Sequence, residues 1–414
     1  MRDIDLYGQI LGVTSPWEVT DVDLRLDAGE VEVSVSYEAS AAMSCPKCGA
    51  PAQRYDTRRR RWRHLPTCQY RTILAAEVPR VRCQEHGVTT IAVPWSDPGS
   101  GFTALFEALI IDWLREASIA AVARQLGLTW DQVDGVMGRA VRRGMLRREL
   151  KPAAHLGVDE TSFAKRHEYV TVVADRGRGI VHHVADGRGR EALATYYEEL
   201  GSEGRATIES VAMDMWGPYI AATLSSLPDA GSKIAFDKFH VAMHLGDAVD
   251  RVRRQENREL LATGDETLKG TKHLWLFHPD RLEGDRGRRF DTLVKKALRT
   301  SRAWMLKELA MEMWEADSRQ DAKVIFDAWY SWAIRSRLAP MKRVARMIKR
   351  HLTGVLNAIE QRVTNARLEG INSIIQGLKR TARGYRNRQR FRNAIYFHLG
   401  GLDLYPHALT HSTS

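Results

Sequence analysis

The sequence of 414 residues contains little cysteine and no long apolar run. Four cysteines are too few, and too unevenly placed, for a disulfide framework, which indicates reduced thiols and a cytosolic protein. Because no stretch of about 18 consecutive apolar residues occurs, we expect no transmembrane helix and no membrane partner. The first residues, MRDIDLYGQILGV, are too short in apolar length and too acidic for a secretory signal.

Basic residues outnumber acidic ones. Lysine and arginine total 62 against 51 aspartate and glutamate residues, so the formal net charge is +11. Solvated surface alone could account for this excess. Many of the cations, however, cluster beside recognisable motifs, at residues 58–61, 142–148, 343–350 and 379–392. Such clusters favour a polyanionic partner, and nucleic acid is the usual one.

Two short motifs have the spacing of metal ligands. Cys45-Pro-Lys-Cys48 and Cys83-Gln-Glu-His86 are each followed by glycine. Thiolate and imidazole are the ligands that Zn²⁺ prefers, and a gap of two residues lets one tight turn supply two of them. These four residues are predicted to hold one structural zinc ion. Two unrelated cysteine pairs, or a buried His86, are the alternatives. Cys68 has no partner at this spacing and is interpreted as a free thiol.

Strands are predicted beside both motifs, at residues 21–38, where apolar and polar residues alternate, and at 71–81. The segment between the motifs carries the run RRRRWRH at residues 58–64. Its cations could hold phosphates, and Trp62 could either stack on a base or pack inside the protein. The predicted DNA contacts of this segment are Arg59, Arg60, Arg61, Trp62 and Arg63.

Residues 103–149 have the pattern of helices. A short helix after Ser118, a turn with Gly127 and a second helix capped by Thr129 are typical of a helix-turn-helix, although an ordinary helical hairpin would have the same pattern. Apolar residues of the second helix are expected to face inward: Val133, Val136 and Met137. The residues expected to meet DNA are Trp130, Gln132 and Arg139, with Arg142 and Arg143 on phosphates.

From Leu156 the pattern changes to alternating strands and helices. Predicted strands cover residues 156–163, 168–175, 179–185, 208–213 and 233–237, with a helix at 190–201. Three antiparallel strands followed by alternating helices and strands are typical of a ribonuclease-H-like mixed α/β sheet. In that sheet the first and fourth strands are neighbours, so Asp159 and Asp214 are expected to converge although 55 residues separate them.

Residues 241–360 interrupt the sheet with an all-helical insertion. Helices are predicted at 240–262, 289–316, 322–334 and 341–356. The last of these has an apolar face opposite a basic one, and its basic residues are Lys342, Arg343, Arg346, Lys349 and Arg350. Five tryptophans of the insertion are interpreted as core residues rather than base-stacking ones.

A further helix follows from Val363. It has a polar stripe beside an apolar one; the polar residues are Asn365, Glu369, Asn372, Gln376 and Lys379. Such a helix could pack on a sheet with one edge over a metal site, or simply expose a solvated face. The apolar residues are Leu368, Ile371, Ile375 and Leu378.

Several carboxylates could bind the metal ions of a phosphodiester-cleaving site. Phosphodiester hydrolysis or transfer needs an activated oxygen nucleophile and a stabilised leaving oxygen, and two Mg²⁺ ions about 3.5–4 Å apart, or Mn²⁺ in their place, supply both. Asp159, Asp214 and Glu369 are the predicted ligands. Other acids could compete: Glu160, Asp175, Asp186 and Asp237. Strand alternation places Glu160 on the side opposite Asp159, whereas Asp237 follows a strand and precedes His240.

The motifs together resemble those of the ISL-three family of bacterial insertion-sequence transposases, across nearly the whole chain. They occur in the order CPKCG, RxWRHL, CxxHG, helix-turn-helix, GVDE, AMDMW, FDKFHV and RxEGxNxxIxxxKRxxxGYRN. The resemblance implies a DDE enzyme with a ribonuclease-H-like core and the catalytic triad Asp159, Asp214 and Glu369. Asp237, His240, Asn372 and Lys379 would lie near the site, and Arg380, Arg383 and Arg386 would hold DNA. Many relatives carry cysteine where His86 stands.

The resemblance also implies an activity. The zinc and helix-turn-helix modules would bind terminal inverted repeats, and the core would cleave the element ends and join the freed 3′-OH groups to target DNA. We expect a bacterial, nucleoid-associated protein that acts as a homodimer or higher oligomer. Two alternatives remain: an inactive DNA-binding regulator, or a nuclease without joining activity.

The expected domains are 1–98 (zinc module), 99–150 (helix-turn-helix), 151–240 and 361–404 (core), 241–360 (insertion) and a flexible tail at 405–414.

Overall fold

The computed structural model describes residues 2–164, 168–276, 282–296, 298–363 and 366–406. Asn365 and most of the expected tail lie outside this description. The chain divides into two compact units. The first is Met1–Glu149 with Thr381–Arg383 and Gln389–Ser414, and the second is Leu150–Arg380 with Gly384–Arg388. None of the described helices is long and apolar enough to cross a membrane.

The first unit begins with a sheet of five strands whose main path runs β1-β2-β4-β3, with β5 paired to β4. Its elements are α1 (Asp3–Ile10), β1 (Trp17–Arg25), β2 (Glu30–Tyr37), β3 (Gln53–Arg63), β4 (Arg71–Cys83) and β5 (Gly87–Thr90). The single strand expected at residues 21–38 is wrong, because a turn at residues 26–29 divides it into a hairpin. Gly29 closes that turn with φ of 61°, a conformation that favours glycine.

Three helices follow the sheet: α2 (Ala104–Glu116), α3 (Ile119–Leu126) and α4 (Trp130–Arg147). Ser118 caps α3, Gly127 ends it in the left-handed conformation, and Thr129 caps α4 in a capping box with Gln132. The three residues of α4 predicted to face inward, Val133, Val136 and Met137, are buried. The predicted helix-turn-helix is therefore present.

The C-terminal helix α16 (Arg388–Leu399) belongs almost wholly to this first unit. Arg390 lies over the Trp130 ring at 4.5 Å and forms ion pairs with Asp131 and Asp134. A β-carbon on Gly144 of α4 would lie 2.7 Å from that of Leu402. Because these contacts fix the C-terminal segment against α4, residues from 389 onward belong to the first unit, whereas we had expected residues 361–404 to belong to the catalytic core.

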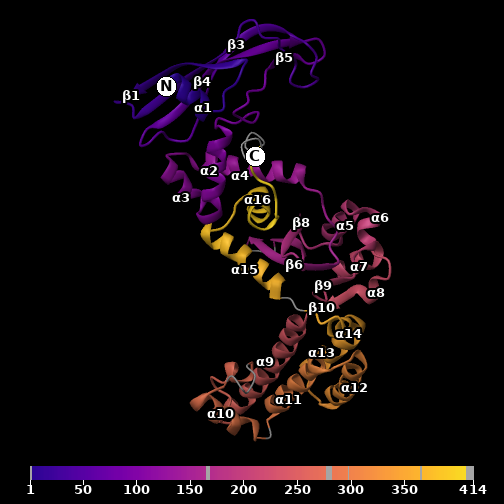
Figure 1. The fold of residues 1–414 in the computed structure, drawn as a ribbon. Helices are drawn as coiled ribbons and strands as arrows, with labels where there is room; N and C mark the ends of the chain where they lie inside the picture. Colours follow the sequence, from indigo (N-terminus) through magenta and orange to yellow (C-terminus); the bar gives the residue numbers. More distant parts are fainter. Residues whose placement is uncertain (1, 165–167, 277–281, 297, 364–365, 407–414) are drawn as a thin grey trace. The chain divides into compact units, whose positions relative to one another are not determined.

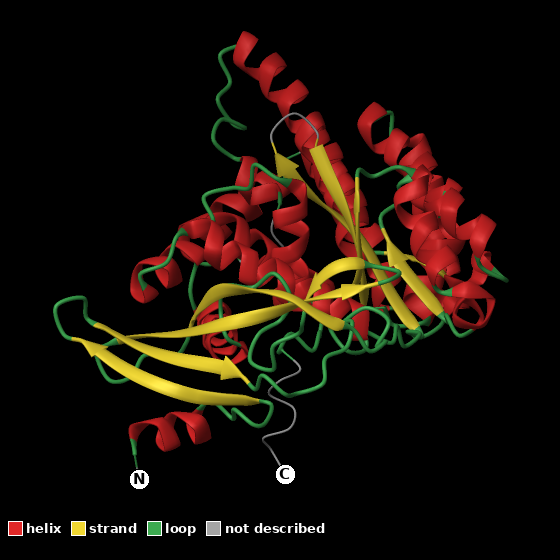
Figure 2. Cartoon of the chain, turned by 90° about the horizontal axis from the view of Figure 1, so that it is seen from above, coloured by secondary structure: helices red, strands yellow, loops and turns green. Residues whose placement is uncertain are grey.

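The second unit contains the predicted ribonuclease-H-like sheet, with strand order β10-β9-β6-β7-β8. Strands β6, β7 and β8 pair antiparallel, whereas β9 and β10 run parallel to β6. Figure 2 shows the strands in yellow among the helices. The elements are β6 (His155–Ala164), β7 (Glu168–Asp175), β8 (Ile180–Asp186), α5 (Arg190–Glu199), α6 (Gly201–Ala206), β9 (Ser210–Met213), α7 (Gly217–Ser226), α8 (Ala230–Lys233) and β10 (Ile234–Phe236).

The insertion is helical, as predicted (Figure 1). Its elements are α9 (Lys238–Ala262), η1 (Lys272–Trp275), α10 (Gly284–Val294), α11 (Arg299–Met311), η3 (Glu312–Glu315), α12 (Arg319–Arg335), α13 (Ala339–Arg350) and α14 (Leu352–Glu360). The single helix expected at 289–316 is wrong. Glu256 of α9 accepts hydrogen bonds from the backbone N–H of Arg299 and Thr300, both at 2.7 Å, and so starts a new helix there. Of the five tryptophans, Trp332 is exposed.

Helix α14 anchors the insertion to the edge strand of the sheet. The Asn357 side chain donates to the carbonyl of Ile234 at 2.8 Å and to that of Gly231 at 2.9 Å. One turn earlier, Gly354 faces the buried ring of Phe236, and a β-carbon at Gly354 would overlap that ring. The close approach of α14 to β10 therefore depends on glycine at this position.

We predict that Gly354→Ala destabilises the protein by about 1–3 kcal/mol, because overpacking against Phe236 outweighs the better helix propensity of alanine. Urea unfolding measures the change as a lower midpoint. Gly377→Ala is the matched control, since a β-carbon on this helical glycine would meet no atom within 4 Å. Equal midpoints for the two variants would contradict the packing argument.

Candidate active site and metal centre

Asp159 on β6 and Asp214, which directly follows the neighbouring parallel strand β9, lie at the same level. Gly157 of β6 pairs with Ala212 of β9, and each aspartate comes two residues after its member of that pair. Adjacent strands are about 4.8 Å apart, so the two carboxylates are neighbours. Burial raises the pKa of Asp159, and the negative charge of Asp214 acts in the same direction. The predicted convergence of these residues is present.

Helix α15 (Ala366–Thr381) lies along β6 and contacts it in register. Four residues of a helix advance about 6 Å and two residues of a strand about 6.6 Å, so every fourth residue of α15 can contact every second residue of β6. Lys379 donates to Ser162 and Gln376 donates to Thr161 at 2.7 Å. Asn372 donates to Asp159, and Leu368 packs where Gly157 has no side chain. The helix therefore places its polar stripe directly over the strand that carries Asp159.

Asp159 and Thr161 both contact α15, so Glu160 between them faces the other side of the sheet, as strand alternation predicted. There its carboxylate lies 3.6 Å from the Arg188 guanidinium. Burial raises the pKa of Glu160, and the charges of Asp159 and Asp214 add to the shift. Glu160 is therefore a neighbour of the site rather than a member of the aspartate pair.

Glu369, the third predicted carboxylate, is exposed on α15. It precedes Asn372 by three residues, one helical turn on the same side of the helix. Among the described residues, the only group of three or more side chains that could hold a metal ion is elsewhere, so the three carboxylates do not close around one point here. The buried Oδ1 of Asn372 has no hydrogen-bond partner, which leaves an unsatisfied oxygen beside Asp159.

Asp237 and His240 extend the site along the sheet. Phe236 pairs with Met213, so Asp237 is level with Asp214. Asp237, however, is buried and caps α9 by accepting a hydrogen bond from the Phe239 N–H at 3.0 Å. His240, in the first turn of that helix, brings Nδ1 to 3.7 Å from Asp214 Oδ1. The cap thus fixes the helix that places His240 beside the carboxylates.

Arg188 is a residue that the sequence motifs did not indicate. Its guanidinium lies 4.6 Å from the Tyr169 ring and 4.5 Å from the Trp216 ring, and the Trp216 indole N–H donates to the Arg188 carbonyl at 2.9 Å. Its contacts come from three separate segments of the chain. No spacing in the sequence marks such a constellation, although Trp216 belongs to the AMDMW motif.

The predicted zinc ligands Cys45, Cys48, Cys83 and His86 gather at the ends of β4 and its neighbouring turns, with ligand atoms all within 4.8 Å of one another. Cys48 Sγ and Cys83 Sγ are 3.7 Å apart, and His86 Nδ1 is 3.8 Å from Cys45 Sγ. A disulfide would need about 2.05 Å, whereas tetrahedral ligands at about 2.3 Å from Zn²⁺ have this separation. Backbone N–H groups of Lys47 and Cys48 lower the pKa of Cys45 to about 6, which favours the ligating thiolate.

Comparisons with known proteins agree with this geometry. A transposase family model, that of DDE transposases of family ISL3, matches residues 156–395. The helix-turn-helix domain of transposase family ISL3 matches residues 91–141, and the zinc-finger of transposase IS204/IS1001/IS1096/IS1165 matches residues 41–86. The chain belongs to the ISL3 family of DDE transposases.

Two curated relatives extend over almost the whole chain. The transposase for insertion sequence element IS1557 of Mycobacterium tuberculosis is 29% identical over 420 residues, with 94% of each chain covered. The transposase for insertion sequence element IS1001 of Bordetella parapertussis is 27% identical over 386 residues, covering 92% of this chain and 95% of the relative. The similarity therefore includes the N-terminal modules as well as the core.

DDE transposases imply a divalent metal, and the donor set of this ISL3 transposase fits one. Asp159 and Asp214 offer hard carboxylate oxygens side by side, and the unpartnered Oδ1 of Asn372 adds a third oxygen next to them. Oxygen ligands of this kind are those that Mg²⁺ and Mn²⁺ prefer.

Residues 58–63 of the basic run lie at the end of β3, and most of their side chains contact other parts of the protein. Trp62 is fully buried and packs edge-on against Trp95 at 5.5 Å, so it cannot stack on a DNA base, and packing is its role. Arg59 and Arg61 form ion pairs with Glu32 at 2.7 and 2.9 Å. Arg60 lies over the Trp62 ring, and burial lowers the pKa of Arg63.

Two predicted DNA contacts of α4 are also engaged internally. Arg139 and Arg143 both pair with Glu107, a carboxylate that is 1% exposed, and Arg143 also donates to the Leu404 carbonyl at 3.0 Å. These arginines hold α4 against α2 instead of facing DNA. Trp130, Gln132 and Arg142 are exposed, although Arg390 lies over the Trp130 ring and Gln132 takes part in the capping box of α4. Arg380, Arg383 and Arg386 are also exposed.

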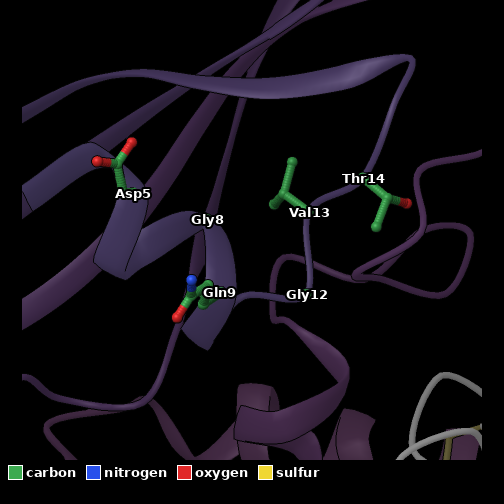
Figure 3. Close-up of a pocket in the computed structure, with 6 residues that line it drawn as sticks. All are labelled: Asp5, Gly8, Gln9, Gly12, Val13 and Thr14. Carbon is green, nitrogen blue, oxygen red and sulfur yellow. The ribbon is translucent and has the colours of Figure 1, made fainter. Parts of the chain in front are cut away.

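A hollow of about 670 Å³ lies beside α1 (Figure 3). It is lined by Asp5, Gly8, Gln9, Gly12, Val13 and Thr14. One carboxylate, one amide and one hydroxyl do not form a reactive set, and none of the predicted site residues lines it.

We predict one zinc ion per chain, measured by elemental analysis of the purified protein. Cys45→Ser should lower the zinc content and the thermal stability together, because binding of a structural metal contributes to folding. His86→Cys should keep the metal, since four thiolates also form a tetrahedral zinc site. Cys68→Ser is the control, and its zinc content should equal that of the unaltered protein. A folded protein without zinc would refute this prediction.

Proposed function

We propose that this ISL3 transposase binds the terminal inverted repeats of its insertion sequence, cleaves the DNA at the element ends and transfers the freed strands to target DNA. The observation that supports the proposal is that Asp159, on β6, and Asp214, directly after the parallel strand β9, are at the same level, with α15 in register along β6. Two acids fixed by backbone pairing, with a third one turn from Asn372, form the donor set that phosphodiester chemistry needs.

In this proposal Asp159, Asp214 and Glu369 hold the metal ions. When bound, two Mg²⁺ ions activate the attacking oxygen and stabilise the leaving oxygen. Asn372 orients Asp159 through its side-chain N–H, and His240 holds its ring beside Asp214. Glu369, exposed one helical turn before Asn372, would complete the set.

The reaction has two steps. In the first, a water oxygen bonds to the scissile phosphorus, and the bond to the 3′ oxygen breaks, which frees a 3′-OH at the element end. In the second, that hydroxyl attacks a target phosphodiester in line, forms a new phosphodiester and releases a 3′-OH of the target. Neither step uses a covalent enzyme intermediate, so the protein contributes position and charge stabilisation.

DNA recognition is assigned to the first unit. The N-terminal end of α4 exposes Trp130 and Gln132, where a recognition helix of this motif contacts base edges, and Arg142 follows on the exposed surface. Arg380 at the end of the Glu369 helix, and Arg383 and Arg386 beyond it, would hold the DNA backbone near the reaction. The pairing of two element ends favours a homodimer or higher oligomer.

We predict that Asp159→Ala, Asp214→Ala or Glu369→Ala lowers cleavage of labelled terminal-repeat DNA by about 10³-fold or more, because each removes a metal ligand. Binding of the repeat should remain, since other modules bind it. Glu209→Gln, at the opposite end of β9 from Asp214, is the control and should cleave normally. Retained cleavage in one of the three variants would remove that residue from the triad.

The same assay separates the alternatives. Absence of cleavage by the unaltered protein in both Mg²⁺ and Mn²⁺ would favour a DNA-binding regulator. Cleavage without joining to a target plasmid would favour a nuclease.

Adjacent arginines of α4 provide a second test. Arg142→Gln should weaken binding of repeat and unrelated duplexes alike and lower the slope of log K against log salt by about 1, while leaving thermal stability unchanged. Arg143→Gln should instead destabilise the fold by about 2–3 kcal/mol, because it removes a partner of buried Glu107. If Arg142→Gln destabilised the fold and left the salt slope unchanged, Arg142 would have a structural role and would not contact DNA phosphates.

A further inference from the structure

Helix α13 lies in a long segment of the insertion that has no acidic residue. Between Asp327 and Glu360 the sequence contains neither aspartate nor glutamate. The same segment contains seven cations: Arg335, Arg337, Lys342, Arg343, Arg346, Lys349 and Arg350. Five of the seven are on α13 itself. The local charge is therefore strongly positive and is not offset within the segment.

One face of α13 is already occupied by the protein. Met341, Ala345 and Ile348 are fully buried in the core of the insertion. Arg343, Arg346 and Arg350 are exposed on the opposite side. Because the apolar face packs against other helices, it is not available to enter a lipid surface, and only the basic face can meet a partner.

The exposed cations of α13 have no acidic partner. In the part of the chain that the structure describes, Lys342, Arg343, Arg346 and Arg350 form no ion pair, and Lys349 lies over the Tyr330 ring at 4.6 Å. Neighbouring helices differ: Arg319 pairs with Glu360 at 3.0 Å, and Arg254 pairs with Asp250 at 3.1 Å. Uncompensated like charges repel one another, so a polyanion bound along this face would offset an existing cost.

The C-terminal end of α13 reaches the candidate active site. His351 directly follows the helix, and its ring packs edge-on against Phe236 at 5.4 Å. Phe236 pairs with Met213, the residue before Asp214. Burial and neighbouring Arg350 lower the pKa of His351, whereas Asp214 opposes the shift, so the two side chains are within electrostatic reach. The basic face therefore begins beside the carboxylates and extends away from them.

We propose that the basic face of α13 binds the backbone of duplex DNA next to the scissile phosphate. This inference rests on the proposed function, since it assigns a second DNA surface to the same reaction. A helix of twelve residues is about 18 Å long, which corresponds to about five base pairs. Cations three and four residues apart repeat along one side of the helix, as a linear polyanion requires and a single small anion does not. The face positions DNA at the carboxylates independently of the helix-turn-helix.

The test uses the full-length protein and a duplex of about 40 base pairs, roughly four helical turns of DNA, that carries the terminal repeat and its flanking DNA. Affinity is measured by fluorescence anisotropy over a series of salt concentrations. The triple variant Arg343→Gln, Arg346→Gln, Arg350→Gln should bind more weakly, with the salt slope smaller by about 0.9 for each phosphate that the variant no longer neutralises. A triple variant to lysine at the same positions should keep the slope, because the charge is preserved.

The matched control replaces three ion-paired cations of the same insertion, Arg254→Gln, Arg319→Gln and Lys323→Gln. These should leave the salt slope unchanged. An equal decrease of slope in the control would show a general charge effect and would overturn the assignment to α13. Weaker binding to phosphatidylglycerol vesicles without any change on DNA would overturn it as well.

Uncharged methylphosphonates locate the contact. Placed within about five base pairs of the scissile bond, the length that α13 spans, they should weaken binding by the unaltered protein and have little further effect on the glutamine triple variant. The same decrease with both proteins would place α13 away from that DNA.

If the unaltered protein does not cleave but the salt slope of the glutamine triple variant falls as expected, the proposed function fails and the α13 surface stands. If it cleaves and the slope is unchanged, only the α13 surface fails.

Discussion

The backbone pairing of β6 with β9 is the constraint on which the site depends. A parallel ladder fixes the relative position of two strands residue by residue, so Asp159 and Asp214 are level because Gly157 pairs with Ala212. A slip of one residue would turn one carboxylate to the other face of the sheet. The buried residues of β6 and β9, with Leu156 and Val211 fully inside, resist that slip because it would expose them.

Two glycines allow helices to pack closely on the strands of this sheet. Gly157 has no side chain where Leu368 packs, so α15 approaches β6 closely, and the similar rise of helix and strand continues the contact through Asn372 and Gln376. At the edge strand of the sheet, Gly354 lets α14 approach Phe236. The last helix of the insertion, α14, and the helix that follows it, α15, therefore each approach a strand of the sheet at a glycine, Gly354 on α14 itself and Gly157 on the strand β6.

Much of this could be predicted from local patterns. The ligand spacing of Cys45, Cys48, Cys83 and His86 depends on tight turns, and the strands that carry Asp159 and Asp214 have clear apolar runs. Other features could not be predicted from local patterns, because they depend on contacts between residues that are far apart in the sequence. Glu256 of α9 starts α11 from a position 43 residues before Arg299, and Arg390 fixes α16 on α4 through Asp131 and Asp134. Such capping and pairing follow from the tertiary fold, which periodicity does not encode.

The basic clusters show the same limit for function. In the sequence, Arg59, Arg143 and Arg346 are equivalent members of arginine-rich runs. In the structure, Glu32 pairs with the first and buried Glu107 pairs with the second, whereas the third is exposed and forms no ion pair with any described residue. A cation that gives up an acidic partner to bind phosphate loses that ion pair, which lowers its net gain, most of all where the partner is buried, as Glu107 is. An unpaired cation releases counterions on binding without such a cost. We therefore propose that the arginines contributing most to DNA affinity are those that form no ion pair among the described residues, on one face of α13 and on the exposed side of α4.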